Sequence, residues 1–113
     1  MQLKFSNRGT TLIAGISGEM DHHSAEYFKQ KIDGEMVKST TKNIIFDFSK
    51  VSFMDSSGIG AILGRYKNLQ NLKGKAAIVN ANTQIIRIFE MSGLLKLIPI
   101  YDNIDNAVSS LEA

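Results

Sequence analysis

The chain has 113 residues, 43% of them hydrophobic and 21% charged, a composition typical of one globular domain and not of a disordered segment. A formal net charge of +2 without blocks of like charge gives no support to nucleic-acid binding, and the absence of cysteine excludes disulfides and thiolate zinc sites. No stretch approaches the roughly 18 apolar residues that span a membrane. The first segment has a polar break at residues 6–11 that a signal peptide lacks, so we expect a cytoplasmic protein that does not bind membranes.

The first third of the chain predicts a β-hairpin followed by a helix. Two β-rich runs, residues 2–5 and 11–17, flank the turn-forming triplet Asn7-Arg8-Gly9. Asp21 then precedes a segment whose apolar residues recur at helical spacing, and either Asp21 or Ser24 is suited to cap that helix. The apolar residues of this helix are Ala25, Phe28, Ile32 and Met36.

A buried strand and a second helix follow, with the stretch FMDSSGIG between them. Residues 43–48 are apolar at nearly every position, which is typical of a central strand covered on both faces. From Ser57 to Leu72 a single apolar stripe indicates a helix, which Gly74 ends. The stripe consists of Ile59, Ile62, Leu63, Tyr66 and Leu69.

Four more elements complete the chain. They are a strand over 75–79, a helix over 83–91 that ends at Gly93 in the left-handed conformation, a short strand within 94–100 interrupted at Pro99, and a helix through Leu111 capped by Asp102 or Asn103. The order is roughly ββαβαβαβα. It predicts the α/β class, with a small mixed β-sheet and helices packed against it. Because no linker or repeat divides the chain, we expect a single domain over 1–113.

Three interpretations compete for the polar residues of FMDSSGIG, and the first is a serine nucleophile. The strand–serine–helix arrangement is typical of a nucleophile elbow, but Met54 stands where the motif G-x-S-x-G requires its first glycine. A nucleophile also needs a base, and the two histidines, His22 and His23, have no apparent acid partner. The motif is therefore incomplete.

The other two interpretations are a helix cap and a phosphoacceptor. A cap explains Asp55 or one of the serines. It leaves unexplained the three following glycines, each of which lowers helix propensity by roughly 1 kcal/mol and leaves bare backbone for close approach. A phosphate at Ser56 would add about −1.5 to −2 charges, which the positive end of the helix dipole tolerates. The three glycines are Gly58, Gly60 and Gly64.

Three segments carry a resemblance to a known family. GEMDHHSAEYFKQKI at 18–32, FMDSSGIGAILGRYK at 53–67 and IFEMSGLLKLI at 88–98 resemble, in the same order, the anti-sigma factor antagonists of the STAS superfamily. General-stress members more often have threonine beside the phosphorylated serine, so Ser57 and the D-H-H segment favour the sporulation branch. The resemblance implies a small β-sheet with helices.

The resemblance also implies a function as a switchable binding protein. Ser56, the serine directly after the aspartate, would be phosphorylated by an ATP-binding anti-sigma factor serine kinase that otherwise holds sigma factor F inactive. The unphosphorylated chain would bind this kinase and free the sigma factor, phosphorylation would end binding, and a serine phosphatase would restore it. The chain itself would catalyse nothing and hold no cofactor, because ATP and magnesium belong to the kinase. A general-stress antagonist, a constitutive scaffold and a serine hydrolase are the alternatives.

The residues expected to contact the kinase surround Ser56. Asp55 caps the helix or orients the seryl hydroxyl, and by resemblance Asp21 lies on a rim where an arginine of the partner could pair with it. Gly58, Ala61 and Arg65 lie opposite the apolar stripe and are expected to face outward. Ile59, at the edge of the stripe, is either a core residue or an exposed anchor. The full expected set is Asp21, Asp55, Ser57, Gly58, Ile59, Ala61 and Arg65. Two adjacent histidines on a helix point in different directions, so we expect no metal site. We expect a monomer.

Overall fold

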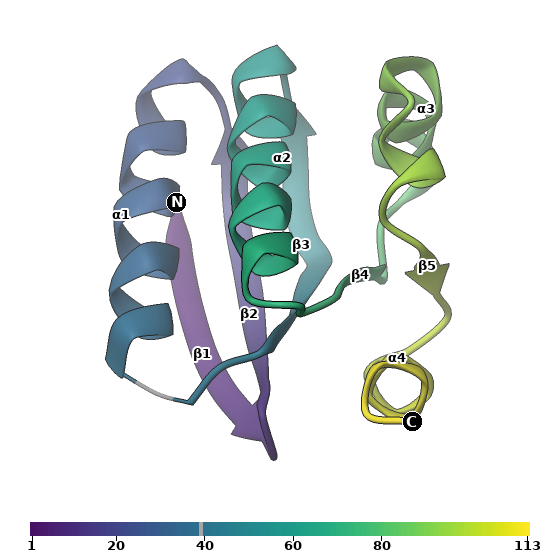
Figure 1. The fold of residues 1–113 in the computed structure, drawn as a ribbon. Helices are drawn as coiled ribbons and strands as arrows, with labels where there is room; N and C mark the ends of the chain where they lie inside the picture. Colours follow the sequence, from purple (N-terminus) through teal and green to yellow (C-terminus); the bar gives the residue numbers. More distant parts are fainter. Residues whose placement is uncertain (39) are drawn as a thin grey trace.

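A computed structural model describes residues 1–38 and 40–113, and it contains one mixed sheet of five strands in the order β1-β2-β3-β4-β5 (Figure 1). The elements are β1 (Gln2–Arg8), β2 (Thr11–Met20), α1 (His22–Lys38), β3 (Asn43–Met54), α2 (Ser56–Asn71), β4 (Ala76–Val79), α3 (Thr83–Ser92), a 3-10 turn (Leu94–Lys96), β5 (Ile100–Tyr101) and α4 (Ile104–Leu111). The predicted fold class is confirmed. No helix in the described part of the chain is long and apolar enough to cross a membrane.

Strand pairing combines one hairpin with a parallel sheet. β1 and β2 are antiparallel around a turn at Gly9, whose φ of 59° suits glycine, so the predicted hairpin is confirmed. β2, β3, β4 and β5 are parallel neighbours. The ladder between β2 and β3 runs from the pair Thr11–Asn43 to the pair Met20–Met54, with irregular register near Gly18. Both strands are therefore longer than their apolar runs predicted.

Helices cover both faces of the sheet, and the larger core lies under α1, α2 and α3. Alternate residues of β2 and β3 face this core together with Phe28, Ile62 and Phe89. The other face carries a smaller apolar cluster that α4 covers with Ala107 and Leu111. The strand residues of that smaller cluster are Ile13, Ile45, Ala77 and Val79. This division is why the central strands are apolar at nearly every position.

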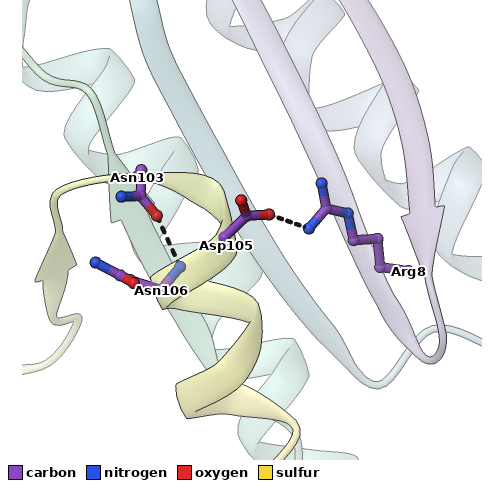
Figure 2. Close-up of polar contacts among 4 residues, drawn as sticks. All are labelled: Arg8, Asn103, Asp105 and Asn106. Atoms are coloured by element: carbon purple, nitrogen blue, oxygen red, sulfur yellow. Dashed lines mark hydrogen bonds and ion pairs between the residues drawn. The ribbon is translucent and has the colours of Figure 1, made fainter.

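Polar contacts attach α4 to the hairpin at the start of the chain. Figure 2 shows the guanidinium of Arg8 donating to the carboxylate of Asp105, and the side chain of Asn103 accepting from the backbone N–H of Asn106. Asn103 is thus the cap of α4, one of the two caps expected. Glu112 accepts from the N–H of Thr10 at 3.2 Å. The last helix is held to the first turn of the sheet by side chains on its exposed surface.

The last strand is shorter than predicted. Of residues 94–100 only the final one belongs to β5, and a 3-10 turn begins at Leu94. Gly93 has the predicted left-handed conformation with φ of 80°, and its carbonyl accepts from the N–H of Lys96 at 3.1 Å, which continues the turn. Leu94 and Ile98 are both buried, and the N–H of Ile98 donates to the carbonyl of Leu94 at 2.9 Å, an i to i+4 hydrogen bond that belongs to a helical turn and not to a strand.

Candidate functional site

Two helices begin side by side at one edge of the sheet. Met20 and Met54 are paired at the ends of β2 and β3, and the N–H of Asp55 donates to the carbonyl of Met20 at 3.2 Å. Because the two strands are parallel neighbours, the helices that follow them, α1 and α2, start next to each other (Figure 1, top of the view). This edge, at the carboxyl ends of parallel strands, is where α/β sheets commonly bind ligands.

Asp55 caps α2 and places Ser56 at the first position of the helix. The Asp55 carboxylate accepts from the N–H of Ser57 at 2.9 Å, and its carbonyl accepts from the N–H of Gly58 at 3.1 Å. The cap expected at Asp55 is confirmed, and α2 begins one residue earlier than predicted. Ser56 is exposed whereas Ser57 is half-buried, so the first of the two hydroxyls is the one open to a partner.

Asp21 and Ser24 cap α1 together. The N–H of Ser24 donates to the Asp21 carboxylate at 2.9 Å, and the N–H of Asp21 donates to the Ser24 hydroxyl at 2.9 Å. Both expected caps therefore act in one reciprocal arrangement. The hydrogen bond from the Ser24 N–H is the main cause that lowers the pKa of Asp21 below its ordinary value, so the carboxylate stays ionised near neutral pH.

One side-chain contact joins the two helix starts. The Nδ1 of His22, the first residue of α1, lies 3.5 Å from the hydroxyl oxygen of Ser57 on α2. This contact was not predicted from the sequence. The available signal was the position of D-H-H directly after one strand and of D-S-S directly after the next. At 3.5 Å the pair is longer than the distance at which a general base normally holds its nucleophile.

Three residues expected to face outward are buried. Ala61 is 1% exposed, Arg65 is 9% exposed, and Gly58 is also buried, so the predicted orientation is wrong for all three. The reason is that α2 packs against the sheet and also against α1, which buries two flanks of the helix. Arg65 faces α1, where its Nε lies 3.1 Å from the carboxylate of Asp33.

An apolar groove lies beside Ser56. Ile59 is 8% exposed and lines this groove, which runs between the start of α2 and α3. On α3 the groove is formed by Ile88 and by Met91, whose side chain is 83% exposed. Neither residue was among those predicted to contact a partner, because both lie some thirty positions from FMDSSGIG, although the segment 88–98 was part of the resemblance. The same groove includes Met54, Asp55 and Ser92.

A second groove lies on the other side of the site, against α1. It is lined by Glu19, Asp21, His23 and Tyr27, together with Met1, Gly18 and Ser24. Ser56 therefore stands near an apolar surface, and Asp21 near an acidic one. Among the described residues, no group of three or more histidine, aspartate or glutamate side chains could hold a metal ion.

The chain matches a family over nearly its whole length and named relatives over three quarters of it or more. The description of the STAS domain fits residues 2–107. The anti-sigma F factor antagonist of Paenibacillus polymyxa is 38% identical over 112 residues, which cover 99% of this chain and 96% of that protein. The anti-sigma-B factor antagonist of Bacillus subtilis (strain 168) is 31% identical over 85 residues, which cover 75% of this chain and 76% of that protein.

Two solved structures of SpoIIAA have folds similar to that of this chain. The anti-sigma factor antagonist SpoIIAA in its unphosphorylated form has a TM-score of 0.85 and 28% identity, covering 98% of this chain and 96% of that one. The Bacillus cell fate determinant SpoIIAA in the phosphorylated form has a TM-score of 0.74 and 28% identity, covering 96% and 98%. These matches confirm the resemblance to anti-sigma factor antagonists, and the chain belongs to the STAS domain family.

Proposed function

We propose that this chain is an anti-sigma factor antagonist of the sporulation type. In its unphosphorylated form it binds an ATP-dependent anti-sigma factor serine kinase and so releases sigma factor F, and phosphorylation of Ser56 switches this binding off. One observation carries the proposal: an exposed Ser56 stands at the first position of α2 in a chain 38% identical to an anti-sigma F factor antagonist. The lower identity and coverage of the sigma-B relative support the sporulation type over the general-stress type.

The start of α2 can carry a phosphate without loss of the fold. The N-terminal amides of a helix and its dipole favour an anion at this position. Ser56 is exposed, so a kinase can reach its hydroxyl and the added group remains in water in the free protein. Ser57 is less suited to this role because it is half-buried and its N–H already donates to Asp55.

The surface around Ser56 suits a protein partner. Ile59, Ile88 and Met91 offer an apolar groove, and aliphatic contacts of this kind at the centre of an interface contribute much of the binding energy. On the side of α1, the ionised carboxylate of Asp21 is available to a lysine or arginine of the kinase. A partner that covers Ser56 reaches both surfaces.

The switch follows from where the phosphate is placed. In the complex, a dianion on Ser56 would be removed from water beside apolar side chains and next to the carboxylate of Asp55, and both effects oppose binding. Gly58, Ala61 and Arg65 contribute indirectly in this scheme, since they are buried and hold α2 against its neighbours. The chain itself is a binding module without catalysis or cofactor, and a serine phosphatase returns it to the binding form.

Incubation with the cognate kinase and Mg·ATP followed by mass spectrometry tests the proposal. We expect a single phosphate on the peptide that contains Ser56, and none when Ser56→Ala is used as the control. A chain that binds the kinase but never gains phosphate at Ser56 would instead be a constitutive scaffold.

A further inference from the structure

Phosphorylation would concentrate negative charge at the shared edge of α1 and α2. Asp21 and Asp55 cap the two helices, and the phosphate brings about −1.5 to −2 further charges. The helix ends offer only partial positive charge, equivalent to about half an elementary charge each. A side-chain cation near Ser56 would therefore lower the free energy of the phosphorylated state.

The described residues that line the two grooves offer no lysine or arginine for this purpose. The groove of Ser56 is lined by apolar and small polar residues and by Asp55, and the groove of Asp21 contains His23 as its one cationic side chain. Arg87 lines an adjoining hollow that shares Met54, Ile88 and Met91 with the groove but does not include Ser56. Among the described residues, the side chain that can become a cation and is seen to contact α2 at this edge is His22, through the hydroxyl of Ser57 at 3.5 Å.

We propose that His22 is the counter-ion of the phosphate on Ser56 and that its imidazolium stabilises the phosphorylated, non-binding state. This inference rests on the proposed phosphorylation of Ser56. His22 is a positioning residue in this scheme, because it holds the phosphate at the helix start and takes no part in the transfer reaction.

The geometry at the helix start supports this pairing. The Cα atoms of Ser56 and Ser57 are about 3.8 Å apart, as in any trans peptide. Ser56 is the first residue of α2, and His22 is the first residue of the adjacent helix. The two starts are held together by the N–H of Asp55, which donates to the carbonyl of Met20 at 3.2 Å.

The pairing makes the phosphorylated state sensitive to pH. The pair needs a protonated imidazole and a doubly charged phosphate, so it weakens at higher pH as the ring loses its proton. The other charged groups of the described residues that line the two grooves are Glu19, Asp21, Asp55, the amino group of Met1, and His23, whose ring centroid lies 6.2 Å from that of His22.

Phosphorus NMR on protein that carries genetically encoded phosphoserine at position 56 tests the inference. Because a nearby cation favours the dianion, the phosphate of the wild type should titrate at lower pH than that of His22→Gln, by about half a unit, or roughly threefold in proton affinity. His23→Gln is the matched control, and we expect it to titrate like the wild type. Amide spectra outside the two helix starts establish that each variant is folded.

Equal midpoints for wild type and His22→Gln would overturn the inference, and so would a shift caused by His23→Gln alone. The phosphate is installed without a kinase, so this result is independent of the test of the proposed function. If the kinase does not modify Ser56, the proposed function fails whatever the titration shows.

Discussion

Gly58 lies so close to Met20 that a β-carbon on Gly58 would stand 3.1 Å from the Cβ of Met20 and 3.3 Å from its carbonyl oxygen. It would also stand 3.1 Å from the Cγ of Met54. The first turn of α2 is thus pressed against the paired ends of β2 and β3, and the absence of a side chain at Gly58 makes this approach possible. The presence of glycine at position 58 is therefore explained by packing beneath the proposed phosphorylation site, and not by a turn or a cap.

Replacement of Gly58 by alanine should lower the free energy of unfolding by about 1 kcal/mol or more. The gain in helix propensity, about 1 kcal/mol, is outweighed because the backbone carbonyl of Met20 cannot easily move away from the new methyl group. Chemical denaturation measures the change. Gly64→Ala is the matched control, since a β-carbon there meets nothing within 4 Å, and it should stabilise the chain by up to about 1 kcal/mol. Equal effects of the two substitutions would contradict this account.

Variants of Ser56 should separate binding from folding. Ser56→Ala should bind the kinase constitutively, because it cannot be phosphorylated, whereas Ser56→Asp should bind weakly because it places a permanent charge beside the apolar groove. Since Ser56 is exposed, both variants should unfold within about 0.5 kcal/mol of the wild type. Titration calorimetry with the kinase gives the affinities. Equal affinity of all three proteins would refute gating by charge at this position.

Met91 should contribute to kinase binding and not to stability. Its side chain is 83% exposed in the free protein, so Met91→Ser removes little buried surface, yet it deletes an apolar wall of the groove beside Ser56. We expect binding to weaken about tenfold or more, with unfolding unchanged within about 0.5 kcal/mol. Val37, which is 85% exposed on α1, provides the control: Val37→Ser should leave the affinity unchanged.

The carboxylate of Asp21 should make the stability of the fold depend on acid pH. Its folded-state pKa is lowered from an ordinary value of 3.8, chiefly by the N–H of Ser24, so the unfolded chain binds this proton more readily. The stabilising effect is therefore present above the unfolded pKa and is lost as the pH falls through the lower folded value. Asp21→Asn caps the helix about as well but does not titrate.

Denaturation midpoints from about pH 5 down to about pH 2 check this expectation. The wild type should lose more stability over this interval than Asp21→Asn. Parallel curves for the two proteins would show that the cap makes no pH-dependent contribution.

The contact between Arg65 and Asp33 should be energetically coupled. Arg65 is almost fully buried between α1 and α2, whereas the Asp33 side chain is 48% exposed, so solvent screens part of the attraction. Asp33→Asn should cost about 1–2 kcal/mol by leaving the guanidinium without its carboxylate. In an Arg65→Met background the same substitution should cost less than about 0.5 kcal/mol. A double-mutant cycle of unfolding free energies gives the coupling, and a value near zero would mean that the two side chains act independently.

Local patterns in the sequence predict most elements of this fold, but they do not reveal how elements pack on one another. The hairpin, the caps at Asp21 and Asp55 and the left-handed Gly93 each depend on a few neighbouring residues, and all were predicted. The orientation of α2 was not, because a single apolar stripe describes a helix with one buried side. Arg65 is buried against α1, an element whose position beside α2 follows from the sheet order, and Gly58 is buried against the ends of β2 and β3.

The site was predicted only in part for the same reason. Asp55, Ser56 and Ser57 are consecutive, so their proximity required no knowledge of the fold. Met91 reaches the site from a helix thirty-five residues further along the chain. His22 does so because Met20 and Met54 share one rung of a parallel ladder, and register between distant strands cannot be deduced from either strand alone.

The ladder between β2 and β3 also limits how a phosphate on Ser56 can change the molecule. In this ladder Ile44, Ile45 and Phe46 are fully buried. The backbone amides of such a core strand exchange their hydrogens with water only when the whole domain opens. Ser56, which would receive the phosphate, directly follows the cap residue Asp55 at the end of this ladder. Phosphorylation at Ser56 should therefore change the surface charge and leave the fold unchanged. Amide exchange rates in the central strands should be the same before and after phosphorylation.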